Sequence, residues 1–321
     1  MLAFTSLVAG ILLHIPDGFL SLIISLLCWL ATVVMLVVAV RKAQADYDER
    51  LIPVAGVMAA FIFAAQMLNF PVAGGTSGHL IGAALAFIVL GPWLGLLVMT
   101  AVIALQALLF QDGGLIVMGA NILVMGIVPG FVGYGVYRLA VYRSKSLKLA
   151  TAGVGAWLSI VAAALVTALL LAFSGTAKLS VVVPVMVGVH MLIGIGEALV
   201  TVAALAFIMR SRPALLDERA ASAGGRWVLV GLGIALLVVL FAPYASPSPD
   251  GLEWVAGQQG FLETALDAPY HFLPDYTIPG LGETDLSTIV AGVVGVLVVT
   301  AVILLIGRFL KRPQRSQSGG Y

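Results

Sequence analysis

The stretch Phe19-Leu-Ser-Leu-Ile-Ile-Ser-Leu-Leu-Cys-Trp-Leu-Ala-Thr-Val-Val-Met-Leu-Val-Val-Ala-Val40 runs for 22 residues without a charged side chain. A helix needs about 20 apolar residues to cross the hydrocarbon core of a bilayer, so this stretch predicts a membrane span. The whole chain has the same character, because 61% of its 321 residues are apolar, only 10% are charged and the mean hydropathy is +1.13. Soluble domains carry about a quarter charged residues. The sequence therefore predicts an all-α, polytopic membrane helical bundle.

Nine segments are apolar enough to be read as spans, about seven in a first block and two in a C-terminal hairpin. They are 19–40, 51–69, 79–91, 92–110, 115–140, 149–173, 181–209, 226–243 and 287–307. The run 79–110 is too long for one span. Gly91-Pro92 divides it, because proline removes a backbone donor and restricts the residue before it.

The basic residues predict the orientation of these spans, since Lys and Arg gather on the cytoplasmic side. With nine spans and an outside start, 15 of the 16 basic residues fall on inner segments, and only Lys178 does not. The outer loop 244–286 carries seven acidic residues and no Lys or Arg. This arrangement predicts that His14 and His79 lie outside and that the C-terminus is cytoplasmic. The net charge of +1 gives no indication of a nucleic-acid partner.

The composition predicts two unequal parts. Residues 14–210 form a compact membrane domain with short connections, and the polar, Gly/Ala-rich segment 211–225 reads as a cytoplasmic linker. Residues 226–321 form a two-span domain enclosing the acidic loop 244–286, a loop whose field could also steer cations.

Residues 1–13 form an apolar extension that lacks a positive n-region and an A-x-A cleavage site. Three interpretations remain open: an imperfect leader that is removed, an extra piece of helix, or a misassigned start. In the last case translation begins at Leu13.

Two histidines stand beside turn-forming residues at the mouths of apolar segments, in Leu13-His14-Ile15-Pro16-Asp17-Gly18-Phe19 and in Gly74-Gly75-Thr76-Ser77-Gly78-His79. Ionisable groups at membrane depth are costly and therefore functional candidates. Two imidazoles at one end of a bundle suit Ni²⁺, Co²⁺ or Cu²⁺. If Leu13 became the first residue, its free amine, the amide nitrogen of His14 and the His14 imidazole could close fused rings around one ion, with His79 as fourth ligand. Both the amine and the amide must lose protons, so such binding depends strongly on pH.

Several polar side chains near these histidines are candidates to orient them. Thr76 and Ser77 could donate hydrogen bonds to the imidazoles, and so could Gln66 and Asn69 unless they only cap helix ends. Asp17 is expected to cap the first long helix, with orientation of a histidine as the alternative.

His190 and Glu197 lie seven residues apart in one span and hence on the same helical face. They are either a structural hydrogen-bonding pair or part of a path for metal or protons. Asn121 is open to the same two interpretations and is also a candidate to help orient the histidines. Cys28 is read as a small core residue, which excludes a disulfide within the chain.

An enzyme is the contrasting class of function. Gly75-Thr-Ser77-Gly and Gly188-Val-His190 look superficially like elements of rhomboid intramembrane serine proteases, and a Ser–His pair supports nucleophilic catalysis. That alternative leaves His14 and His79 unexplained. A passive metal permease is a third possibility. The sequence contains no G-x-x-x-x-G-K-[ST] phosphate loop, so active transport would need an ATPase partner.

The run His14-Ile-Pro-Asp-Gly-Phe-Leu-Ser closely resembles the mature N-terminus of the CbiM/NikM family, the substrate-capture components of cobalt and nickel energy-coupling factor (ECF) transporters. Two further stretches are similar: Phe63-Ala-Ala-Gln-Met-Leu-Asn-Phe-Pro through His79, and Gln106-Ala-Leu-Leu-Phe-Gln-Asp-Gly-Gly through Asn121. The C-terminal part resembles the PDGLE or NikN-like companion subunit in Pro249-Asp-Gly-Leu-Glu253 and Pro274-Asp-Tyr-Thr-Ile-Pro-Gly280.

The resemblance implies a multi-pass protein of a prokaryotic cell membrane that binds Ni²⁺ or Co²⁺ as its transported substrate. It implies ATPase subunits and a coupling membrane protein as partners. Its metal ligands would be the terminal amine (of Leu13 after processing), His14 and His79. The extension before Leu13 departs from the family pattern, because it separates the amine from His14.

Overall fold

The computed structural model describes residues 14–72, 74–211 and 225–311, and most of the chain within them is helical. The helices are α1 (Leu22–Ala45), α2 (Leu51–Gln66), α3 (Ala83–Leu90), α4 (Pro92–Leu105), α5 (Met118–Ile122), α6 (Val128–Arg138), α7 (Lys145–Phe173), α8 (Leu179–Ser211), α9 (Gly225–Leu240), α10 (Gly251–Gln259) and α11 (Asp285–Leu310). Two π-helical segments, Gln106–Phe110 and Leu123–Ile127, prolong α4 and join α5 to α6. The predicted all-α bundle is confirmed.

Six of the nine predicted spans correspond to helices long and apolar enough to cross a membrane. The segments predicted at 51–69 and 226–243 contain the shorter apolar helices Leu51–Gln66 and Arg226–Leu240. The segment 79–91 differs most, because only the eight residues of α3 are helical there. The chain reaches α3 as irregular backbone and enters the helix through Gly82 at φ +78°. The predicted break at Gly91-Pro92 is observed, since α3 ends at Leu90 and α4 begins at Pro92.

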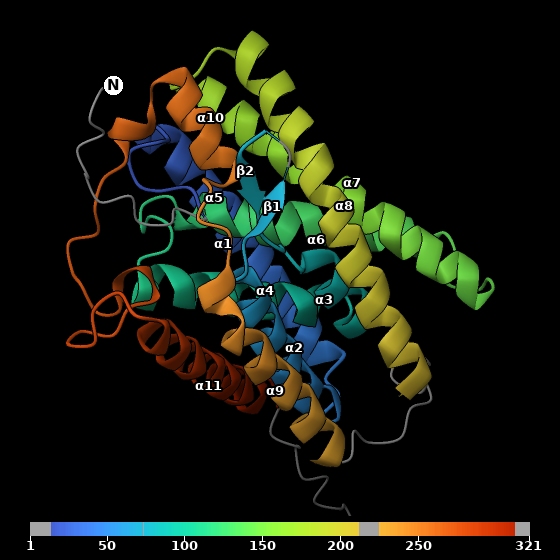
Figure 1. The fold of residues 1–321 in the computed structure, drawn as a ribbon. Coiled ribbons are helices and arrows are strands. Elements are labelled where there is room, and N and C mark those ends of the chain that lie inside the picture. The colour runs from blue at the N-terminus through green and yellow to red at the C-terminus, as the bar shows by residue number, and fades with distance from the viewer. Residues whose placement is uncertain (1–13, 73, 212–224, 312–321) are drawn as a thin grey trace, which may run out of the picture.

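A two-stranded antiparallel hairpin precedes that irregular segment. Its strands are β1 (Phe70–Val72) and β2 (Thr76–Gly78), with Phe70 opposite Gly78 and Val72 opposite Thr76. The hairpin places His79 directly after β2, at the end of the bundle where the loop before α1 also lies (Figure 1).

The C-terminal part packs against α2. Helices α9 and α11 lie beside α2 in Figure 1, and α11 and α9 are its main neighbours. Almost all of α2 is buried, as expected for a helix that is apolar on every side. Two glycines of α11 permit its close approach to α2. A Cβ on Gly295 would lie 2.0 Å from the Phe63 ring, and a Cβ on Gly307 would lie 2.4 Å from the Ile52 side chain.

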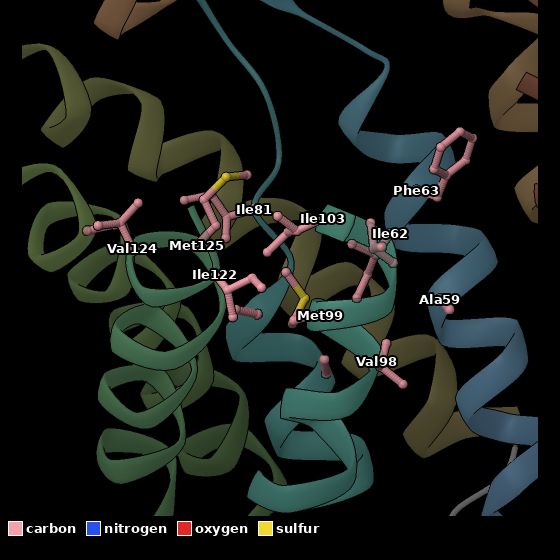
Figure 2. Close-up of a cluster of buried hydrophobic side chains, with 14 of the residues drawn as sticks. Ala59, Ile62, Phe63, Ile81, Val98, Met99, Ile103, Ile122, Val124 and Met125 are labelled. Carbon is pink, nitrogen blue, oxygen red and sulfur yellow. The ribbon is translucent and has the colours of Figure 1, made fainter. Parts of the chain in front are cut away.

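The centre of the bundle is filled by aliphatic and sulfur-containing side chains. Figure 2 shows Ile62 of α2, Met99 and Ile103 of α4, and Ile122 of α5 converging between their helices. All four are almost completely buried. By contrast, α1 exposes a stripe that includes Ile23, Leu26 and Leu30, as a lipid-facing helix does.

The segment between α9 and α11 covers the end of the bundle that carries the two histidines. It makes backbone hydrogen bonds with three separate segments: Leu266 N–H to Asp17 O before α1 (2.8 Å), Ser77 N–H in β2 to Pro249 O (2.8 Å) and Leu273 N–H to Leu109 O in the π-helical segment (3.1 Å). The predicted acidic loop therefore covers this end of the bundle and is hydrogen-bonded to the segment before α1, to β2 and to the π-helical segment after α4.

Candidate metal-capture site

The rings of His14 and His79 lie close together, with centroids 6.0 Å apart and planes tilted by 51°. His14 comes from the loop before α1 and is buried, whereas His79 follows β2 and is partly exposed. Sixty-five positions separate the two residues in the sequence. The loop before α1 and the β1–β2 hairpin bring them to one place.

His14 is held by a carboxylate that sequence reasoning missed. Its Nδ1 lies 2.6 Å from Oδ1 of Asp112, and both side chains are inaccessible. A carboxylate only accepts, so Nδ1 carries the proton and donates it. The other ring nitrogen, Nε2, is buried and has no hydrogen-bond partner among the described residues.

Asp112 is positioned in turn by the C-terminal part of the chain. The Tyr276 hydroxyl donates to Oδ2 of Asp112 at 2.7 Å, and Nε2 of Gln106 donates to that hydroxyl at 3.3 Å. The Tyr276 ring stacks on Phe110 with centroids 4.6 Å apart. Asp275 and Tyr276 both have positive φ (48° and 56°), a conformation that costs energy in non-glycine residues and often occurs at functional sites. Burial and the nearby Asp112 charge raise the pKa of Tyr276 well above its usual value, so the phenol remains a donor.

The backbone beside His14 is fixed by Asn121, one of the predicted orienting residues. Its amide accepts from Ile15 N–H at 3.0 Å and donates to Ile15 O at 2.9 Å. Glycine at 113 leaves room for this arrangement, because a Cβ there would lie 2.9 Å from both Asn121 Nδ2 and His14 Cβ. Asn121 thus acts on the residue next to His14 and not on the imidazole.

The expectation that Asp17 caps the first long helix is wrong. The N-cap of α1 is Ser21, whose side chain accepts from Ile24 N–H. The Asp17 carboxylate instead accepts from Leu115 N–H (3.0 Å) and Val117 N–H (3.1 Å). Both donors lie just before α5, which begins at Met118, so the carboxylate ties the His14 loop to the chain entering that helix.

The hairpin that carries His79 is anchored to the acidic loop. Ser77 donates its hydroxyl to Ser248 O at 2.7 Å as well as its N–H to Pro249 O. Asn69 accepts from Ser246 N–H through its backbone carbonyl, at 2.7 Å. Thr76 is buried in the same hairpin. Ser77 and Asn69 therefore orient the hairpin as a whole, and neither is bonded to an imidazole ring in the described structure.

Asp250 is the second carboxylate at the histidine pair. Its Oδ2 lies 4.0 Å from Nε2 of His79, while Oδ1 accepts from Glu253 N–H at 2.7 Å and caps α10. Burial raises the pKa of Asp250 to about 6 despite its backbone donors. The acidic loop thus contributes one defined carboxylate to this end of the bundle, in addition to its overall charge.

His190 and Glu197 share one face of α8, as predicted, but they have separate partners. Nδ1 of His190 lies 2.7 Å from Met186 O in its own helix. The Glu197 carboxylate accepts from Ile81 N–H (2.7 Å) and Gly82 N–H (2.9 Å), just after His79. Gln66 donates to Ile81 O at 2.8 Å from the other side.

Two histidines with adjacent carboxylates do not yet make a complete metal site. In the described part of the chain, no group of three or more His, Cys, Asp or Glu side chains is placed to hold one ion together. Leu13, whose amine is a predicted ligand, lies outside the described residues. Cys28 is a free, buried thiol.

Comparison with known proteins assigns the family. Residues 14–215 match the model for the cobalt uptake substrate-specific transmembrane region, CbiM, and residues 225–312 match the PDGLE domain. The chain belongs to the CbiM family. It carries a PDGLE domain fused at its C-terminal side, as the sequence motifs predicted.

Two relatives whose names also describe a fusion are similar over nearly their whole length. A putative fused nickel transport protein NikMN from Archaeoglobus fulgidus is 36% identical over 304 residues, which is 93% of this chain and 99% of that protein. A probable fused nickel transport protein LarMN from Lactiplantibacillus plantarum is 31% identical, over 89% of this chain and 95% of that protein. The crystal structure of a truncated transition metal transporter, 34% identical, superposes with a TM-score of 0.56 and covers 62% of this chain and 99% of that one.

Proposed function

We propose that this CbiM-family chain is the substrate-capture subunit of an uptake system for Ni²⁺ or Co²⁺. It would bind the ion through nitrogen ligands at the outer end of the bundle and pass it inward when an ATPase pair acts through a coupling membrane protein. The observation that carries the proposal is the pair of imidazoles 6.0 Å apart, from two loops distant in sequence, beside the carboxylates of Asp112 and Asp250. Imidazole nitrogens suit Ni²⁺ and Co²⁺.

The ligands would be His14, His79 and the terminal amine created at Leu13 by processing or by a later start. Closing a six-membered ring between the His14 amide nitrogen and its own imidazole requires Nδ1, because Nε2 points away from the backbone. Nδ1 donates to Asp112 in this structure. Forming the chelate would therefore replace the hydrogen bond to Asp112 by the metal and move the imidazole proton to Nε2. The protons released would be those of the terminal amine and the His14 amide, which makes capture more favourable at higher pH.

The two competing functions have weaker support. The Ser77 hydroxyl donates to a backbone carbonyl of the C-terminal part, and Nδ1 of His190 is engaged within α8, so the described geometry offers no Ser–His nucleophile. A passive permease would need no partner, which makes it distinguishable by experiment. The named relatives are transport proteins.

Uptake by reconstituted vesicles tests the proposal. The chain is inserted into liposomes with its ATPase and coupling proteins, and radioactive ⁶³Ni²⁺ is followed with and without ATP. The proposal expects ATP-dependent accumulation that requires all the partners. Accumulation by the chain alone would instead establish a permease, and absence of accumulation with all partners and ATP would contradict the proposal.

Sequencing the N-terminus of the membrane-inserted protein tests the ligand set. A first residue at Leu13 is the expected result. An intact Met1 terminus would exclude the amine from the ligand set and leave the two imidazoles to act with other groups.

A further inference from the structure

The most deeply buried carboxylate of the helical bundle has no role in the ligand set proposed above. Glu197 sits in the middle of α8 with no accessible surface, within a helix of 33 residues that is long and apolar enough to cross a membrane. An ionisable residue at such depth is expensive and calls for a partner. Its partners are the two backbone N–H groups of Ile81 and Gly82.

These backbone groups belong to the irregular segment that joins His79 to α3. Non-helical backbone inside a membrane protein must be satisfied by the protein itself, because no water is present in the lipid to do so. The carboxylate supplies two acceptor oxygens and no donor, which suits two consecutive N–H groups. Gln66 of α2 donates to the carbonyl of the same residue, Ile81, so the segment is held from both sides.

The same face of α8 contacts both ends of the hairpin–helix connection. Ile193, one turn before Glu197, packs so closely on Gly78 that a Cβ there would lie 2.7 Å from its side chain. His190 lies against Gly251, directly after Asp250. Figure 1 shows the β1–β2 hairpin lying against α8. His79 is thus held between two fixed points, Gly78 and Ile81, that are set by one helix.

We infer that Glu197 is a positioning residue for metal capture: it fixes the backbone after His79 and so sets where the His79 imidazole meets His14. This inference rests on the proposed function, because it assigns Glu197 a role in metal binding. It gives the buried carboxylate a function distinct from carrying the ion or a proton through the bundle. Ligand positions matter at the level of about 0.5 Å in a metal site, so loosening this anchor weakens binding.

The substitution Glu197→Gln tests the inference while keeping the size of the side chain. Glutamine retains one acceptor oxygen but turns an NH₂ group toward the second backbone N–H. The matched control is Thr201→Val, a near-isosteric change at a buried position one turn further along α8 whose hydroxyl has no partner in the described structure. Both variants are made in the full chain, purified in detergent and compared by thermal unfolding.

Hydrogen–deuterium exchange gives a readout that does not depend on metal. The expected result is faster exchange of a peptide covering residues 79–83 in Glu197→Gln, with a peptide from α9 unchanged and Thr201→Val like the wild type. Unchanged exchange at 79–83 would overturn the inference whether or not the chain binds Ni²⁺. The exchange experiment can therefore reject the role of Glu197 in fixing residues 79–83 independently of whether the chain captures Ni²⁺.

Equilibrium binding of metal tests whether Glu197 acts through His79. Glu197→Gln is expected to weaken Ni²⁺ binding by about 10-fold or more, the range seen when an outer-shell partner of a metal ligand is removed. Thr201→Val should bind like the wild type. The loss is then measured with Cu²⁺ in both the wild-type and the His79→Ala backgrounds, because N-ligand sites hold Cu²⁺ more tightly than Ni²⁺ and one metal must serve all four variants.

In the His79→Ala background Glu197→Gln should have almost no further effect, because coupled residues are not additive. An equal loss in both backgrounds would assign Glu197 a general structural role and overturn the inference, as would wild-type affinity in the single variant. If Glu197→Gln does not fold, Gln66→Met removes the opposite hydrogen bond to Ile81 and is put through the same cycle. The outcomes that support or overturn the inference are the same as those for Glu197→Gln.

Discussion

The imidazole of His14 and the carboxylate of Asp112, 98 positions apart in sequence, form a buried hydrogen bond of 2.6 Å in which Nδ1 donates to Oδ1. The second oxygen of Asp112 is taken by the Tyr276 hydroxyl from the PDGLE domain. One carboxylate therefore joins the candidate metal ligand of the first domain to the second domain. This relation brings the fused domain to the candidate site.

Removing the Tyr276 hydroxyl should destabilise the protein. Tyr276→Phe keeps the stack on Phe110 but withdraws a donor from a buried carboxylate, and a hydrogen bond to a charged group contributes about 1.5–3 kcal/mol. Denaturant unfolding in detergent measures the change. The control is Tyr270→Phe, whose hydroxyl makes a longer bond of 3.2 Å to Ala107 O in a less buried setting. Equal effects of the two variants would contradict the role given to Tyr276.

Gly18→Ala should detach the acidic loop from the loop that carries His14. Gly18 has φ +95°, and a Cβ would fall 1.9 Å from the Thr264 carbonyl oxygen. The left-handed backbone alone costs about 1–2 kcal/mol for a non-glycine residue, and the collision adds to that. The control is Gly175→Ala, which has a similar φ of +76° but open space around it. A thermal midpoint that falls no further in Gly18→Ala than in the control would refute the close contact.

The stability of the PDGLE domain should fall as the pH rises. Burial and the neighbouring Asp250 raise the pKa of Glu253 from 4.5 to about 7, so the folded chain binds this proton more tightly than the unfolded chain. The stability that the protonated Glu253 side chain contributes is fully present at low pH and is lost as the pH rises from about 4.5 to about 7. Glu253→Gln should therefore be more stable than the wild type at pH 8 and gain little at pH 4.5. Unfolding midpoints across this range measure the difference, and equal midpoints of the two proteins at pH 8 would contradict the prediction.

The acidic loop should lie outside the cell. In a Cys28→Ser background, Glu263→Cys places a thiol on the exposed loop and Ser211→Cys places one at the far end of α8. A maleimide that does not cross membranes should label the first in intact cells and the second only after permeabilisation. The reverse pattern would invert the orientation deduced from the basic residues.

The sequence predicts the helices well because hydropathy and helix breakers are local properties. The uncharged run 19–40 and the Gly91-Pro92 break both have clear counterparts in α1, α3 and α4. The segment 79–91 was predicted less well, because residues 79–82 are irregular backbone packed inside the protein and only Ala83–Leu90 are helical. The Glu197 carboxylate that satisfies this backbone lies more than 100 residues away.

In the candidate site, too, residues with a local signal in the sequence could be predicted, and residues whose role depends on a distant partner could not. The two histidines could be found from turn residues at the ends of apolar segments, and Asn121 from its polarity inside a span. Asp112 and Tyr276 were missed as functional residues, because their roles depend on each other across 164 positions. Asp112 stands in a Gln-Asp-Gly-Gly turn, and Asp250 stands in the PDGLE motif, so a polar residue within a turn was the available signal. Asp17 was assigned to the wrong helix because Ser21 is closer to the start of α1.

Equilibrium binding of Ni²⁺ to the purified full chain, compared with His79→Ala, tests the central claim most directly. The account predicts one Ni²⁺ per wild-type chain and a loss of affinity in His79→Ala at least as large as the roughly 10- to 100-fold that removal of an outer-shell partner causes. The variant His271→Ala, at an exposed histidine of the acidic loop, should bind like the wild type. Equal Ni²⁺ affinity in the wild type and His79→Ala would contradict the account.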